Sequence, residues 1–193
     1  MWVRVVGSIG FLCYFIYDIN SVTIKNHVLQ KFFLLGTLLA AVSTAGILMK
    51  GWDGMCASWI RTLCFGIFAL FMFGLLVYTL FFALPFDATY VEESRERRAY
   101  TEGVYALCRH PGVLWFALMY LGIAGMIWNG EALLDGGLLI AWNTAYICLQ
   151  DWRIFPKTFT NYEDYRQMTP FLIPNGRSVR RCRETWGRGE ITR

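Results

Sequence analysis

The sequence predicts an all-α integral-membrane protein with about five transmembrane helices, and three observations support this fold class. Hydrophobic residues make up 56% of the 193 residues and charged residues only 17%, whereas about a quarter of a soluble protein is charged. The apolar residues are gathered into runs of about the length that crosses a bilayer as a helix. Polar and charged residues are concentrated between these runs and at the C-terminus. We expect a single domain over residues 1–193.

The first part of the chain, residues 1–86, holds three of the predicted helices, at 2–17, 32–49 and 59–86. The first is short, and we expect it to end near Asp18 and Asn20. No cleavage site of small residues follows it, so we expect a retained helix rather than a signal peptide. The third run is longer than the hydrocarbon layer is thick, so it must tilt or protrude.

The second part is predicted to contain a polar connector, a helical hairpin and a tail, at residues 87–112, 113–150 and 151–193. The hairpin helices cover 113–128 and 132–149, joined by the turn sequence NGE at 129–131. The connector sequence EESRERR, at 92–98, has charges of both signs at helical spacing, which indicates a solvated helical face or a lid. We expect Asp135 to be solvated or paired near the outer face. Asn143 lies deeper and either packs or faces a pocket.

Charge placement predicts the topology. Five helices put the connector at 18–31, the connector at 87–112 and the tail on one side, and the positive-inside rule makes that side cytoplasmic. Half of the 18 basic residues lie from Asp151 onward. We interpret this cluster first as a topology signal and second as a contact with anionic membrane lipids. A chain this apolar is not expected to bind nucleic acid, and its six cysteines lack the C-x-x-C spacing of a zinc site.

The stretch CRHPG, residues 108–112, is the first candidate site. Pro111 is suited to the first position of a helix, where no amide partner is lost. The amides that follow, starting at Gly112, form the positive end of a helix dipole and can bind an anion. Arg109 and His110 add positive charge there, so the stretch is suited to a carboxylate or phosphate.

The sequence LQDWRIF, at 149–155, is expected to return to the same place because the second hairpin helix runs back toward the cytoplasm. Asp151 and Arg153 should then lie close to Arg109 and His110. On these residues alone, a boundary salt bridge with a snorkelling arginine is as good an explanation as a ligand site.

Two flanking segments, TEGVYALCRHP before the hairpin and NYEDYRQMTPFLIP after it, carry a family resemblance. Their order resembles the integral-membrane methyltransferases that include isoprenylcysteine carboxyl methyltransferases and phospholipid N-methyltransferases. In that family a Gly-x-Tyr and an Arg-His-Pro precede a two-helix hairpin. A glutamate pair, a Tyr-x-x-Tyr and a proline-containing stretch follow it. The resemblance covers residues 100–175.

The resemblance implies the cofactor S-adenosyl-L-methionine, in a pocket made by the hairpin and the tail. It implies a lipophilic methyl acceptor such as a prenylcysteine carboxylate, a lipid amine, or a small hydrophobic thiol or acid. Arg109, His110 and Asp151 become the expected catalytic residues. The expected cofactor-binding residues are Gly103, Tyr105, Arg109, His110, Pro111, Gly112, Asp151, Tyr162 and Tyr165.

The chain departs from the family pattern at three places. Asp151 is the only acid where the family has two glutamates. Val113 and Trp115 stand where the family often has a tyrosine and then a glycine. Phe159 precedes the Tyr-x-x-Tyr without the expected glycine.

The cofactor is a zwitterion at its methionine end, which assigns the expected roles. Its carboxylate would accept hydrogen bonds from Arg109, His110 and the helix N-terminus. Its ammonium would face Asp151. Its adenine needs a flat apolar wall, for which the candidates are Trp115, Phe116, Trp152 and Tyr162.

Two other function classes remain open. Sterol-type membrane reductases carry a similar Arg-His-Pro near a C-terminal hairpin but use a nicotinamide cofactor, and this chain is short for that class. A non-enzymatic membrane scaffold would use only the cationic tail, to bind anionic lipid. The pattern contains no signal for an oligomeric state.

Overall fold

The computed structural model describes residues 1–83 and 97–186, and every regular element in these ranges is helical. Four helices are long and apolar enough to cross a membrane: Trp2–Val22, His27–Lys50, Trp59–Phe82 and Gly130–Thr158. A fifth apolar helix, Pro111–Ile127, is shorter. An all-α membrane protein is therefore confirmed in outline, whereas a count of five crossings stays a prediction.

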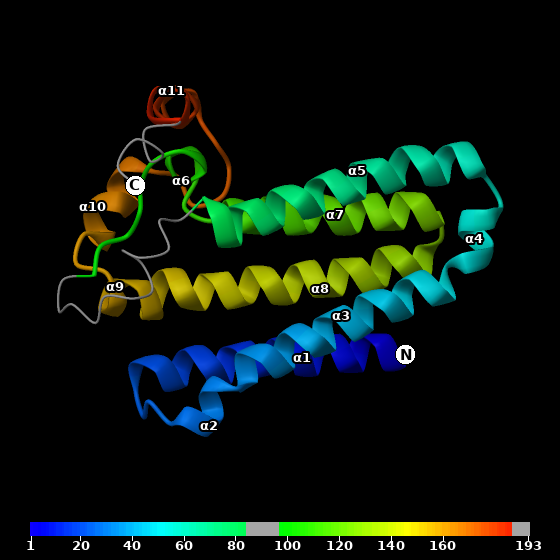
Figure 1. Cartoon of the computed structure of the whole chain (residues 1–193), viewed down its shortest axis with the longest axis horizontal. Helices are drawn as coiled ribbons and strands as arrows, with labels where there is room; N and C mark the ends of the chain where they lie inside the picture. The colour runs from blue at the N-terminus through cyan, green and yellow to red at the C-terminus, as the bar shows by residue number, and fades with distance from the viewer. Residues whose placement is uncertain (84–96, 187–193) are drawn as a thin grey trace.

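The long helices lie side by side along one axis (Figure 1). α5 (Trp59–Val77) packs on α7 (Pro111–Ile127), α7 on α8 (Gly130–Leu149), and α8 on α1 (Trp2–Val22), which also packs against α3 (Phe32–Lys50). Apolar side chains between these helices form the core, while those facing away are exposed, as expected of lipid-facing surfaces.

The shorter elements gather at the two ends of the bundle (Figure 1). At one end lie α2 (His27–Gln30), α6 (Val104–Leu107), α9 (Phe155–Thr158), α10 (Tyr162–Met168) and α11 (Gly176–Thr185). The N-terminus and α4 (Trp52–Cys56) lie at the other. The described parts of the two connectors and of the tail thus share one end of the molecule, as the topology argument predicted.

The contact between α1 and α3 depends on glycine. A Cβ added to Gly36 would lie 2.8 Å from the carbonyl oxygen of Gly10, and one added to Gly10 would lie 3.1 Å from the carbonyl oxygen of Gly36. The two backbones can approach this closely only because neither residue has a side chain. The first predicted helix is therefore anchored firmly to the second.

The expected end of the first helix was wrong, because α1 continues to Val22. Asp18 and Asn20 looked like residues that stop a membrane helix, but both are buried. Gln150 donates to the Asp18 carboxylate at 2.7 Å, and the Asn20 side chain bonds the Asn26 backbone at 2.8 and 3.0 Å. Partners inside the protein therefore replace the water that these groups were expected to need.

The hairpin has the predicted form. α7 runs from Pro111 to Ile127, and the residue that caps it, Trp128, adopts the left-handed conformation with φ 59°. Asn129 then caps α8 by accepting a hydrogen bond from the Ala132 amide at 2.7 Å. α8 starts at Gly130, slightly before the predicted position.

The third predicted run is continuous through α5 and a π-helical turn, η1 (Tyr78–Phe82). Its last predicted residues, 84–86, lie outside the described ranges. The same is true of 92–96, so the expected lid remains a prediction, but Arg97 and Arg98, the last two residues of EESRERR, are described and are not helical.

Asp135 lies near the end of the bundle opposite the tail, and it is paired rather than solvated, with 2% of its side chain exposed. Arg4 and Lys50 approach its two oxygens at 2.5 and 3.1 Å. The carboxylate therefore ties together α1, α3 and α8. Such pairing is what an ionisable group at membrane depth requires.

Candidate functional site

Asp151 is the centre of a buried polar cluster at the end of the bundle that carries the tail. Its side chain is 1% exposed. Arg109 donates to its two oxygens at 2.9 and 3.1 Å, and His110 Nε2 lies 2.9 Å from Oδ1. Tyr162 donates its hydroxyl to Oδ1 at 2.6 Å. The structure thus brings Asp151 together with Arg109 and His110, as predicted, and adds Tyr162. Arg153, also expected nearby, is exposed.

The backbone places Arg109 and His110 beside the tail. The Arg109 amide donates to the carbonyl of Pro170 at 2.9 Å, and the His110 amide donates to that of Phe171 at 3.3 Å. The next residue, Pro111, starts α7 and so fixes the direction in which the chain leaves. The segment before α7 therefore lies along the segment after α10, and Asp151 lies within reach of both.

Asp151 belongs to a π-helical turn, η3 (Gln150–Ile154), that follows α8 directly. Such turns interrupt α-helices and frequently occur at functional sites. Here neighbouring residues are directed to different partners. Gln150 donates to the Asp18 carboxylate of α1 at 2.7 Å and to the Tyr146 hydroxyl at 2.8 Å, whereas Asp151 accepts a hydrogen bond from Arg109. The turn joins the cluster to the first helix.

Arg109 is largely committed within the protein. Besides Asp151, its Nη1 donates to the carbonyls of Arg166 and Thr169 at 3.2 and 2.8 Å. Its guanidinium lies over the Phe171 ring, 5.6 Å from the centroid. Most of the N–H donors of a guanidinium are engaged in this way. While these contacts hold, Arg109 positions the tail and has little capacity to bind a ligand carboxylate.

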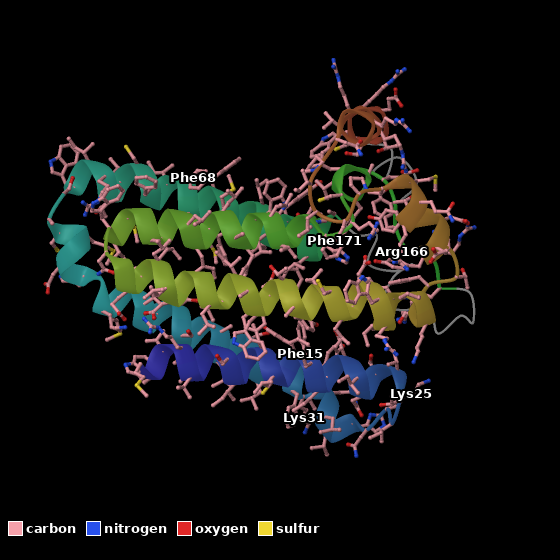
Figure 2. All side chains as sticks on the ribbon, turned by 180° about the vertical axis from the view of Figure 1, so that it is seen from behind. Phe15, Lys25, Lys31, Phe68, Arg166 and Phe171 are labelled. Atoms are coloured by element: carbon pink, nitrogen blue, oxygen red, sulfur yellow. The ribbon has the colours of Figure 1, made fainter. Side chains whose placement is uncertain are left out.

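Arg166 is a second cation at the rim of the cluster, and the sequence interpretation did not single it out. Its Nε lies 3.8 Å from Asp151 Oδ2, and Nη1 lies 3.4 Å from Glu163, whose side chain is 70% exposed. The Arg166 side chain itself is 35% exposed. Figure 2 labels it at the end of the bundle that carries the tail. The signal that could have found it is its position one helical turn after Tyr162, on the same face.

The charges of the cluster balance only when Glu163 at its rim is counted. Burial lowers the pKa of His110 below its ordinary value of 6.5, and nearby Arg109 acts in the same direction against Asp151. Burial, and then the neighbouring Asp151 carboxylate, raise the pKa of Tyr162. With His110 and Tyr162 neutral, two arginines face one buried carboxylate, and only exposed Glu163 offsets the second.

Gly103, Tyr105 and Tyr165 lie at the same end but form a scaffold around the cluster. Tyr165 donates its hydroxyl to the Tyr105 carbonyl at 2.7 Å, and Tyr105 donates its own to the Thr79 carbonyl at 2.9 Å. The Gly103 amide donates to Thr185 Oγ1 at 2.9 Å, and Gly103 has φ 57°, which favours glycine. These contacts connect η1, α6, α10 and α11.

Gly112 was expected to leave the helix N-terminus open to a ligand. A Cβ on Gly112 would meet Leu76 Cδ1 at 3.5 Å and Leu80 Cδ2 at 3.9 Å, so apolar side chains border its α-carbon. The amide of Val113, the next residue, donates to the His110 carbonyl at 3.1 Å. The helix N-terminus at Gly112 is therefore less open to an anion than expected, because apolar side chains border it and the Val113 amide is already bonded.

The expected adenine wall is not gathered in one place. Trp115 donates to Thr79 Oγ1 at 3.0 Å, Phe116 packs in the core against Phe11 and Tyr120, and Trp152 is 67% exposed. Only Tyr162 belongs to the cluster. The aromatic rings that flank His110 are instead Phe155 and Phe171, with centroids 5.8 and 5.1 Å away. Neither ring was singled out from the sequence.

Two remaining groups belong to the hairpin and its start. Asn143 Oδ1, in α8, is buried and has no hydrogen-bond partner among the described residues. Cys108, directly before Arg109, is fully buried, and burial raises its pKa to about 12, so its thiol is kept in the inert, protonated form.

No family model, curated protein or solved structure matches this chain.

Proposed function

We propose that the chain transfers a methyl group from S-adenosyl-L-methionine to a lipophilic acceptor at the membrane surface. The observation that carries this proposal is the convergence on Asp151. The family resemblance singles out residues on both sides of the hairpin, and Arg109, His110 and Tyr162 reach the same carboxylate. The hairpin alone would bring Asp151 near Arg109, but it would not require Tyr162, the first tyrosine of the Tyr-x-x-Tyr, to donate to the same carboxylate. The positive-inside rule supports a cytoplasmic location for this end of the bundle.

The charges of the cluster fit the methionine end of the cofactor, although the individual roles differ from those expected. Arg166 is the cation with donors to spare and an exposed side, so it is the better partner for a carboxylate. Arg109 is a positioning residue held by Asp151. Asp151 Oδ1 already accepts three hydrogen bonds, which leaves little capacity for an ammonium. The unpartnered Asn143 Oδ1 is a buried acceptor in the same hairpin.

The cofactor supplies an activated methyl group on a sulfonium. The protein then has to bind, orient and exclude water. A carboxylate acceptor needs no base, whereas an amine acceptor must first lose a proton. When His110 donates from Nε2 to Asp151, its Nδ1 is the basic nitrogen, and the lowered pKa keeps it unprotonated near neutral pH.

Thermal stability in detergent, measured with S-adenosylhomocysteine and separately with NADPH, tests the proposal. A ligand that binds only the folded state raises the unfolding temperature as its concentration increases. Stabilisation by S-adenosylhomocysteine supports methyl transfer. Stabilisation by NADPH alone would favour a membrane reductase, and no response to either would favour a scaffold.

A further inference from the structure

The tail helix α11 lies across the bundle axis at the end where the long helices stop. Figure 1 shows it almost end-on, while α5, α7 and α8 run along the picture. If the long helices cross the bilayer, α11 lies roughly parallel to the membrane plane and near its surface. This is the orientation of an interfacial helix.

One side of α11 is fixed to the protein. Asn175 and Ser178 form a capping box, and Thr185 Oγ1 accepts the hydrogen bond from Gly103. Arg181 donates to the carbonyl of Met168 at 3.1 Å and to Thr169 Oγ1 at 3.3 Å. These contacts turn the inner side of α11 toward α6 and the cluster. The outer side is therefore presented as a defined surface rather than as a loose tail.

The outer side of α11 is cationic with apolar residues beside it. Arg177, Arg180 and Arg183 are exposed, and Figure 2 shows nitrogen-tipped side chains of α11 directed away from the bundle. Val179 is 50% exposed and Trp186, directly after the helix, is 59% exposed. Arginine next to tryptophan is typical of a membrane–water interface.

Glu184 is the acidic residue on this helix, and it limits the positive charge. It accepts from Arg180 at 2.8 Å, with side chains 52% and 81% exposed. Arg177 and Arg183 have no ion-pair partner among the described residues. The surface therefore retains a net positive charge that calls for an anionic partner at the membrane.

We propose that α11 binds the headgroups of anionic phospholipids through Arg177, Arg180 and Arg183, with Val179 and Trp186 reaching the apolar boundary. The arginines supply the phosphate contacts. The crosswise orientation brings them to the headgroup layer. This binding does not depend on the methyl-transfer proposal.

The test uses the purified full-length chain in neutral detergent and titrates phosphatidylglycerol, with phosphatidylcholine and inorganic phosphate as comparisons. Bound lipid is counted by native mass spectrometry. The variant Arg177→Gln/Arg180→Gln/Arg183→Gln should bind phosphatidylglycerol roughly tenfold more weakly or worse, since one basic residue near an anionic surface is worth about a fivefold change. The matched control Lys31→Gln/Arg153→Gln/Lys157→Gln removes the same charge from exposed positions at the same end.

A gain of binding offers an independent check that does not rely on removing arginines. Glu184→Gln frees Arg180 from its partner, so it should strengthen phosphatidylglycerol binding about two- to fivefold. Equal losses in the two triple variants would overturn the proposal, as would equal binding of phosphatidylcholine. Displacement of the lipid by millimolar inorganic phosphate would also overturn it, because the site would then accept free phosphate.

Discussion

Arg109 and Asp151, 42 residues apart in the sequence, form a bidentate ion pair. Arg109 Nε donates to Asp151 Oδ1 at 2.9 Å, and Nη2 donates to Oδ2 at 3.1 Å. The side chains are 9% and 1% exposed. Because Arg109 also binds two carbonyls of the tail, the pair connects the start of the hairpin, its end and α10. The contact that best explains the architecture is also the contact on which the proposed site is built.

Replacing Asp151 by asparagine should destabilise the protein by roughly 3–5 kcal/mol. The substitution keeps the size of the side chain but leaves Arg109 buried without its counter-charge. The measurement is thermal or denaturant unfolding in detergent, compared with the native chain. S-adenosylhomocysteine should bind less tightly in parallel, because the segments that form the site are no longer held together.

Glu163→Gln is the matched control for that experiment. It removes a carboxylate from the same cluster, but one that is 70% exposed and lies 3.4 Å from Arg166. Such surface pairs contribute about 0–1 kcal/mol. Comparable losses from the two substitutions would show that burial of the Asp151 pair is not what matters.

His110 makes the stability depend on pH in the acidic range. Its pKa in the folded protein is lowered from 6.5, so the unfolded chain takes up a proton at a pH where the folded chain does not. Stability is then constant above that pH and falls as the pH drops through 6.5 toward the folded pKa. Unfolding temperatures measured between pH 8 and pH 5 should show this decline.

The variant His110→Gln isolates this contribution, since it removes the titrating ring while retaining a donor for Asp151. The difference between the native chain and the variant should shrink or change sign below pH 6.5. A constant difference across the range would mean that His110 takes up its proton equally in both states.

Replacing Arg166 by glutamine separates binding from stability. The side chain is 35% exposed and lies 3.8 Å from Asp151, so its loss should change the unfolding temperature little. If Arg166 holds the cofactor carboxylate, the affinity for S-adenosylhomocysteine should fall roughly tenfold, as for a lost charge-assisted hydrogen bond. Calorimetry in detergent measures this, with exposed Arg153→Gln as the control. An unchanged affinity would remove Arg166 from the proposed site.

The sequence predicted the hairpin and the position of Asp151 because both follow from local rules. Pro111 marks a helix start by removing a donor that is not needed there. Asn129 and Gly130 mark a turn. Two helices of similar length must then return the chain to its starting point, which places Asp151 near Arg109. None of these steps requires knowledge of tertiary packing.

The parts that could not be predicted depend on contacts between distant segments. The local sequence indicates a helix end at Asp18, because its partner, Gln150, lies on another helix. The π-helical turn that directs the side chains of Gln150 and Asp151 to different partners has no sequence signature. The hydrogen bonds that Arg109 donates to the Arg166 and Thr169 carbonyls also cannot be inferred from the local sequence. For this reason the sequence predicts that Arg109 and Asp151 lie close together. It does not predict that Arg109 is held within the protein while Arg166 keeps free donors.

Gly103 provides a test of the scaffold that supports the cluster. It has φ 57° and ψ −131°, and a Cβ added there would meet no atom within 4 Å. Gly103→Ala should therefore destabilise the protein by backbone strain alone, by about 1–3 kcal/mol. The hydrogen bond from its amide to Thr185 would be strained with it, which should loosen α11 and increase hydrogen exchange in that helix.

Gly74→Ala is the control for Gly103→Ala, because its added Cβ also meets nothing within 4 Å. Gly74 lies inside α5, where alanine is favoured over glycine by about 1 kcal/mol. The control should therefore be neutral or stabilising in the same unfolding assay. Because the two substitutions add the same methyl group into open space, opposite effects on stability would isolate the backbone conformation of Gly103 as the cause. Equal effects would show that Gly103 is not held at positive φ in the folded protein.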